Sequence, residues 1–171
     1  VNTLNTFAGD YAVSLVGGGT ITTATAFANT GVLTLGDGVT DEITFVGGLD
    51  STAVTAGTQI AGAVATTNTA MNLGAVTLTA DAGLDSGNGT LDIASVTGLA
   101  QRLALQSITS EGDVTIAGDI SVLALDTAAA GYDVSLNGGG TITEDTTFRN
   151  TGVLNLGNDA GDVTVFNGGL D

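Results

Sequence analysis

The sequence predicts an all-β protein built as a parallel β-helix (β-solenoid), with about 20 residues per turn and about eight turns. Three observations lead to this fold. A long block of sequence occurs twice, short apolar triplets recur at a regular spacing inside it, and Gly, Asn and Asp cluster between the triplets. No segment shows a strong helical period, so helices are not expected.

The repeated block is the longest-range feature of the chain. The stretch VSLVGGGTIT at residues 13–22 returns as VSLNGGGTIT at 134–143, a shift of 121 positions. At that shift residues 1–50 align with 122–171 without a gap, and about 29 of the 50 positions are identical. The sequence therefore predicts one continuous solenoid segment over 1–171, containing one full 121-residue unit and part of a second.

A shorter period runs inside the unit, marked by apolar-x-apolar triplets typical of half-buried strands. The spacing is roughly 20 residues, so a unit is expected to contain about six turns. One predicted series comprises Val13/Leu15, Leu33/Leu35, Val54, Val76/Leu78, Leu91/Ile93, Val114/Ile116, Val134/Leu136 and Leu154/Leu156. The second lies near Phe27, Ile43/Phe45, Ile60, Leu84, Leu103/Leu105, Leu123/Leu125, Phe148 and Val163/Val165.

Two strand series on one period predict a coil of parallel strands in which each turn buries the apolar face of its neighbour. The phenylalanines support stacking, because Phe7, Phe27 and Phe45 are spaced by 20 and 18 residues and are expected to form a ladder in the core. An antiparallel sandwich is the competing architecture, but its strands have no reason to repeat in register.

The charge restricts the classes of partner. Eighteen acidic residues face two arginines and no lysine, which gives a formal net charge of −16. Nucleic-acid binding requires a cationic surface, so neither nucleic acid nor an anionic membrane is expected as a partner. No apolar stretch approaches the roughly 18 residues needed to span a bilayer. There is no cysteine, which excludes disulfides and thiol chemistry.

Several short motifs carry a family resemblance. They are GTQIAGAV (57–64), GAVTLTADAGL (74–84), GTLDI (89–93) and GDVTIAGDI (112–120). With them the segment 55–98 resembles the repeats of filamentous haemagglutinin-like exoproteins and the β-strand repeats of giant bacterial surface proteins. The resemblance implies a right-handed β-helix exported to the cell surface, acting as an adhesin or extracellular filament. Its implied partners are neighbouring repeats, like filaments, and the surfaces of host or neighbouring cells.

The chain ends bear on the length of the array. The sequence begins with VNTLNTF and ends with FNGGLD, and both segments resemble the other repeats and show no pattern of a capping segment. The chain is therefore expected to be a section of a longer array.

Catalysis is not expected. The chain has no His and no Cys, so Ser–His–Asp and Cys–His arrangements cannot form. A carbohydrate-active β-helix enzyme, which would need converging carboxylates, is kept as an alternative. A second alternative is an ice-binding solenoid, because Thr-x-Thr occurs at 20–22, 77–79 and 141–143. Such a surface needs these pairs on every turn.

Calcium is the most plausible cofactor, although none is required for the predicted fold. Hard oxygen ligands on a Gly-containing loop suit Ca²⁺, and a solvated acidic turn is the alternative interpretation. The candidate loops are GDGVTDE (36–42) and its second copy GNDAGD (157–162). The candidate ligands in them are Asp37, Asp41, Glu42, Asn158, Asp159 and Asp162.

Asp113 and Asp133 form a further candidate calcium site, because each precedes the first apolar residue of a predicted strand, one turn apart. Stacked at about 4.8 Å, their carboxylates would repel by roughly 0.9 kcal/mol in water. The sequence leaves three resolutions open: a bound cation, side chains that splay apart, or one raised pKa.

Overall fold

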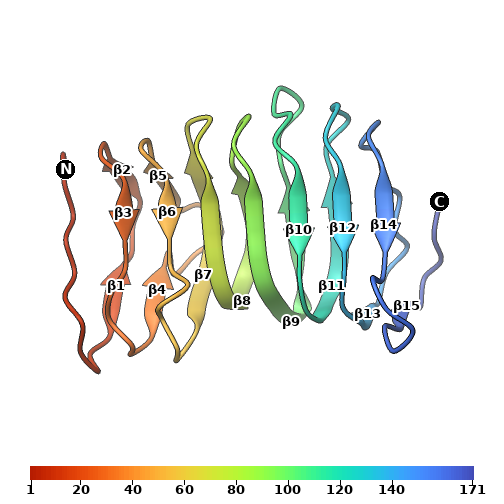
Figure 1. Ribbon diagram of the computed structural model, residues 1–171, viewed down its shortest axis with the longest axis horizontal. Coiled ribbons are helices and arrows are strands. Elements are labelled where there is room, and N and C mark those ends of the chain that lie inside the picture. Colours follow the sequence, from red (N-terminus) through yellow and green to blue (C-terminus); the bar gives the residue numbers. More distant parts are fainter.

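The computed structural model describes residues 1–171 and contains 15 strands and no helix, so no helix is present that could cross a membrane. The coils stack side by side from the N-terminal to the C-terminal end (Figure 1). The strands are β1 (Val13–Leu15), β2 (Gly19–Ile21), β3 (Thr25–Ala26), β4 (Leu33–Leu35), β5 (Glu42–Phe45), β6 (Leu49–Asp50), β7 (Thr58–Thr66), β8 (Met71–Asp85), β9 (Leu91–Leu105), β10 (Val114–Ile116), β11 (Ile120–Thr127), β12 (Val134–Leu136), β13 (Gly140–Ile142), β14 (Leu154–Leu156) and β15 (Thr164–Phe166).

All strand pairs are parallel, and they form three columns, which we call ladders A, B and C. Ladder A contains β1, β4, the start of β7, the middle of β8 and β9, the start of β11, then β13 and β15. Ladder B contains β2, β5 and the ends of β7, β8, β9 and β11. Ladder C contains β3, β6, the starts of β8 and β9, then β10, β12 and β14. The chain visits the ladders in the order A, B, C.

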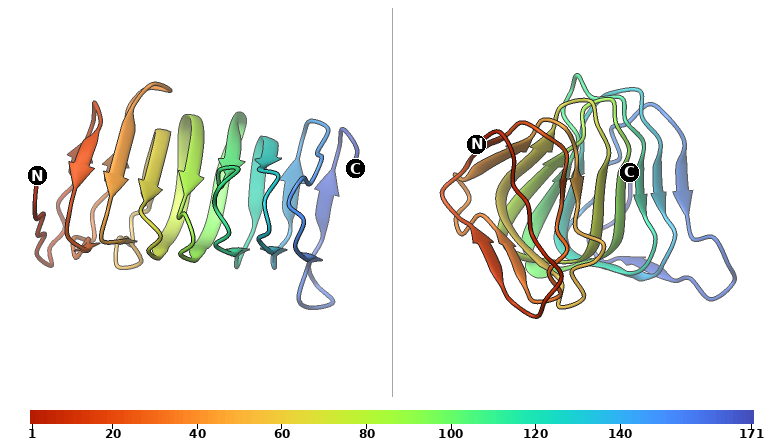
Figure 2. Two further views of the ribbon diagram at one scale, coloured as in Figure 1. Left: turned by 90° about the horizontal axis from the view of Figure 1, so that it is seen from above. Right: turned by 60° about the vertical axis from the view of Figure 1, so that its left-hand side comes forward.

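The predicted β-solenoid is confirmed. Seven steps along ladder A join β1 to β15, so the strands span about 7 turns with neighbouring coils about 21 residues apart. The sequence predicted about eight turns, and the difference has two sources. The coils are slightly longer than 20 residues, and residues 1–12 contain no strand. The view from above shows the resulting rod of stacked coils (Figure 2, left).

The composition of the predicted strand series was partly wrong. Val13, Leu33 and Val76 do lie on ladder A, but Leu91 and Val114 lie on ladder C. The coils vary in length: the ladder neighbour of Leu33 lies 25 residues later, at Thr58, and that of Thr58 lies 18 later. A constant 20-residue step therefore leads from a strand on one ladder to a strand on another. For this reason the two predicted series contain strands from all three ladders.

The two copies of the repeat sit on different ladders. Strand β1 is on ladder A, but its sequence equivalent β12 is on ladder C. Likewise β2 is on ladder B and its equivalent β13 is on ladder A. Five steps along ladder A lead from Val13 to Ile120, and β12 follows two ladders later. The 121-residue unit therefore makes about five and two-thirds turns, not the six that the period predicted.

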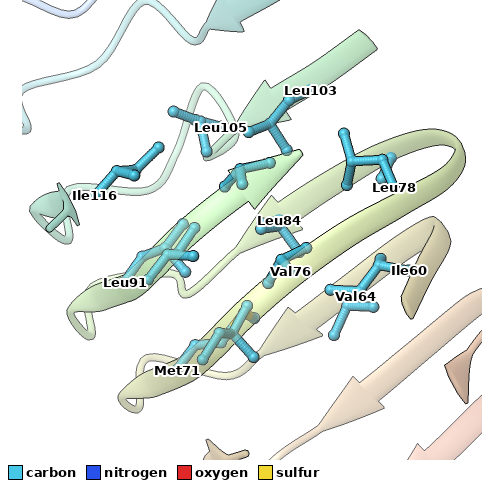
Figure 3. Close-up of a cluster of buried hydrophobic side chains, with 14 of the residues drawn as sticks. Ile60, Val64, Met71, Val76, Leu78, Leu84, Leu91, Leu103, Leu105 and Ile116 are labelled. Atoms are coloured by element: carbon cyan, nitrogen blue, oxygen red, sulfur yellow. The ribbon is translucent and has the colours of Figure 1, made fainter. Parts of the chain in front are cut away.

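One continuous core fills the coil. Thirty buried residues from all three ladders form a single hydrophobic cluster, including Leu33, Ile60, Leu91 and Val134. Figure 3 shows the side chains of β7, β8 and β9 converging on this interior. Each fully buried aliphatic side chain contributes about 1.5–3 kcal/mol. The stack is therefore stabilised mainly by contacts between neighbouring coils.

The predicted phenylalanine ladder is shorter than expected. Phe27 and Phe45 are buried and meet edge to face, with ring centroids 6.1 Å apart. Their equivalents Phe148 and Phe166 repeat the contact at 6.2 Å. Phe7, in contrast, is 77% exposed. No ring contact joins it to Phe27, so the ladder consists of one pair of rings in each copy.

Candidate functional site

The first acidic loop joins β4 to β5, between ladders A and B. Gly36 enters it at φ 76°, a conformation that glycine adopts without strain. One oxygen of Asp41, Oδ2, accepts hydrogen bonds from the backbone N–H groups of Asp37 at 2.8 Å and Gly38 at 3.0 Å. These two N–H groups lower the pKa of the Asp41 carboxyl below its ordinary value. Asp41 therefore closes its own loop.

The second copy has the same local structure between β14 and β15. Asp162 Oδ2 accepts from the N–H groups of Asn158 at 2.7 Å and Asp159 at 2.9 Å. Asp159 Oδ1 in turn accepts from Gly161 N–H at 2.8 Å. The loop begins at Gly157, which has the same φ of 76° as Gly36. This copy lies between ladders C and A, so the two loops leave the rod at different edges.

The geometry gives the calcium hypothesis no added support. The structure contains no group of three His, Cys, Asp or Glu side chains that could hold a metal ion. In each loop one carboxylate oxygen already accepts two backbone N–H groups, as in a self-contained turn. The predicted residues do share a loop in each copy, and the calcium ligand set stays a hypothesis.

We expect calcium to leave the thermal stability nearly unchanged, since a site with few converging ligands binds Ca²⁺ weakly. The measurement is a pair of thermal melts, one with millimolar Ca²⁺ and one with chelator. Magnesium at equal ionic strength is the control for charge screening. A melting temperature that rises with Ca²⁺ alone, and loses that rise in D41N, would contradict this expectation.

Asp113 and Asp133 lie on neighbouring coils, as predicted, immediately before β10 and β12. Asp113 Oδ1 accepts a hydrogen bond from Asp133 N–H at 2.9 Å, and Asp133 Oδ1 accepts from Val153 N–H at 2.7 Å. Each carboxylate is therefore satisfied by a backbone amide of the next coil. This arrangement was not among the three resolutions that the sequence left open.

At four further places an Asp or Asn oxygen accepts the same kind of bond from a backbone amide about one turn further along the chain. We call these bonds the amide seam. Its other members are Asn68 with Asn88 N–H (2.9 Å), Asn88 with Glu111 N–H (3.1 Å), Asp119 with Gly139 N–H (3.0 Å) and Asp81 with Arg102 N–H (2.8 Å). These Asp and Asn side chains thus tie neighbouring coils together. Pairs of Asp or Asn about 20 residues apart are a sequence signal for only two of the bonds, Asn68–Asn88 and Asp113–Asp133.

Replacing Asp133 with Ala should destabilise the rod by about 0.5–1.5 kcal/mol, because Val153 N–H loses its acceptor. D133N keeps an acceptor oxygen and removes the charge, so it should match the wild type or exceed it. The midpoint of urea unfolding measures both variants. Equal midpoints for D133A and the wild type would show that the seam adds nothing to stability.

Tyr132 is a buried polar residue that the sequence analysis did not single out. Its hydroxyl donates to Leu105 C=O at 3.1 Å and accepts from Ala128 N–H at 2.7 Å, and its side chain is fully buried. Burial raises the pKa of the Tyr132 hydroxyl above 10.0. The residue links two coils through a neutral phenol.

Alkaline pH should therefore weaken the fold. A raised folded-state pKa contributes stability that is fully present below the unfolded value of 10.0 and is lost as pH rises through the folded pKa. Unfolding midpoints measured from pH 8 to 12 should fall above about pH 10. Y132F should remove part of this fall, and Y11F, at the exposed equivalent position, serves as the control. An identical pH profile for Y132F and wild type would rule out Tyr132 as its cause.

No cavity brings two carboxylates together. The largest, about 390 Å³, lies at the first coils and is lined by Val1, Leu4, Leu15 and Ile21 among others, with no acidic side chain. Three shallower grooves contain one acid each, Asp50, Asp92 and Asp81. The carboxylate pair that a glycosidase-type enzyme needs is not assembled at any of these surfaces.

The threonine pairs do not form a ranked face. The pair at 20–22 starts on ladder B, whereas those at 77–79 and 141–143 lie on ladder A, three coils apart. Ladder A does present one polar outward residue on most coils. These are Ser14, Thr34, Gln59, Thr77, Thr97, Ser121 and Thr141. The neighbouring file includes Val16 and Leu99, so the paired spacing is lost.

Comparisons with known proteins give no relative. A scan against protein-family models, a search of curated proteins and a search of solved structures each found no match to this chain.

Proposed function

We propose that the chain is a non-catalytic structural segment of a long extracellular bacterial filament or surface exoprotein, of the kind its repeats resemble. The observation that carries the proposal is the uninterrupted stack: one core runs along the coils, and the first 50 residues of the 121-residue unit recur within it. Because each coil contacts only its neighbours, such a rod lengthens by adding coils and keeps its cross-section.

The chemistry of the surface fits an extracellular rod. The chain has no lysine, and its two arginines are the only sites at which a trypsin-like protease could cut. The high negative charge favours solubility. One arginine, Arg102, forms an ion pair with Glu144 two coils away, which adds little stability because both side chains are exposed. The partners proposed for the rod are neighbouring repeats, other filaments of the same kind, and cell surfaces.

The proposal is tested by extending the rod. Chains carrying one and two additional 121-residue units should lengthen by about 27 Å per unit at constant diameter, from the strand spacing of about 4.8 Å. Small-angle scattering and electron microscopy measure both quantities. Separate globules joined by flexible linkers would overturn the proposal. Antibodies raised against the chain should also label intact, unpermeabilised cells of the source organism, and labelling only after permeabilisation would contradict the extracellular location.

A further inference from the structure

We infer that successive 121-residue units present the same surface a third of a turn apart, so that an array displays each surface loop on three sides of the rod in succession. This inference concerns the geometry of the proposed array and rests on the proposed function. It is carried by the ladder positions of the two copies within this one chain.

The rotation appears at each pair of equivalent strands. From the first copy to the second, β1 to β12 moves from ladder A to C, and β2 to β13 moves from B to A. Ladders follow one another along the chain in the order A, B, C, so both shifts are one ladder backward. The direction and size of the shift agree, as a rigid rotation of the whole copy requires.

Local structure survives the change of ladder. Asn29 donates through Nδ2 to Tyr11 C=O at 3.2 Å, and its equivalent Asn150 donates to Tyr132 C=O at 3.1 Å. In both copies the asparagine Oδ1 is buried without a partner. The acidic loops also close in the same way in both places, on Asp41 and Asp162.

The edge-to-face phenylalanine pairs recur as well, at 6.1 and 6.2 Å. The repeated 50-residue segment therefore keeps these contacts on two different sets of ladders. A one-third rotation of the segment is compatible with its local structure.

The rotation determines what a partner meets. In an array, a loop returns to the same side of the rod after three units. Three units make about 17 turns and span roughly 80 Å at the strand spacing. The loops 36–42 and 157–162 accordingly leave the rod at different edges, as their positions between ladders A and B and between C and A show. Partners of such a rod bind single loops from any direction. Simultaneous binding of two loops from one side requires a reach of about 80 Å.

Distances between spin labels on this chain test the rotation directly. The chain has no cysteine, so paired Cys variants can be labelled at chosen sites. The pair S14C/S135C joins sequence equivalents, which lie on ladders A and C with an axial separation of about 27 Å. The pair S14C/T141C joins two positions on ladder A, six coils or about 29 Å apart.

We expect the S14C/S135C distance to be the longer of the two, although its axial separation is smaller, because its labels sit on different sides of the rod. A unit of six whole turns would give the reverse order, and that result would overturn the inference. Unchanged thermal melts confirm that each labelled variant is folded. The result is independent of the extension experiment, since a rotated unit within this chain and a rod that lengthens with added units are separate measurements.

Discussion

Replacing Leu91 with Ala should destabilise the rod by about 2–5 kcal/mol. Leu91 is fully buried at the start of β9, on ladder C, between Met71 of β8 and Val114 of β10. The truncated side chain would leave a cavity in contact with both neighbouring coils. Backbone bonds on each side hold the coils at fixed spacing, so the cavity cannot collapse.

The neighbouring residue provides a matched control. Asp92 follows Leu91 on the same strand and points outward, so D92A should change stability by less than about 0.5 kcal/mol. Urea unfolding followed by far-UV circular dichroism measures both variants. Similar midpoints for L91A and D92A would mean that inward and outward positions had been assigned to the wrong faces, and the single-core description would fail.

Much of the fold could be predicted because its main signal is local. Alternation such as that of Val134, Ser135 and Leu136 shows directly which side chains face the interior, and the recurrence of such triplets shows that the strands stack. The average period was also close to the observed one. These features depend only on the residues of one strand and their nearest counterparts.

The assignment of strands to ladders could not be predicted because it depends on the sum of all preceding loop lengths. Val54 was placed in the strand series, yet it lies in the loop between β6 and β7, where it is still buried. Thr58 and Ile60 occupy the ladder position instead. Any loop that lengthens a coil by a few residues shifts everything after it by up to a third of a turn. The one-third rotation of the repeat therefore became visible only in three dimensions.

The acidic residues show a second limit of sequence reasoning. The composition of the loops around Asp41 and Asp162 fits a calcium ligand set and fits equally a turn closed by its own carboxylate. The two differ in whether the oxygens converge on an ion or on backbone N–H groups, and residue types do not encode that direction. The amide seam has the same origin: Asp113 and Asp133 were interpreted as a pair of stacked carboxylates, and the hydrogen bonds of their oxygens to amides of the next coil could not be read from residue types.

Replacing Gly62 with Ala should destabilise the protein by more than about 2 kcal/mol, for two reasons that act together. Gly62 has φ 72°, which costs a residue with a Cβ roughly 1 kcal/mol or more. A Cβ at this position would also lie 2.4 Å from Asp41 C=O and 2.7 Å from Gly38 C=O, both in the first acidic loop. The loop lies directly against this glycine, so the substitution should displace it.

Gly83 is the matched control, because it pairs with Ala63 on the same ladder and a Cβ there meets nothing within 4 Å. Its φ is not in the left-handed region, so G83A should be neutral or stabilising by up to about 1 kcal/mol through the unfolded state. Thermal melts rank the two variants, and a spin label at V39C on the tip of the loop reports its displacement. Equal melting temperatures for G62A and G83A, with unchanged mobility of the label, would refute the close packing of one coil's loop against the backbone of the next.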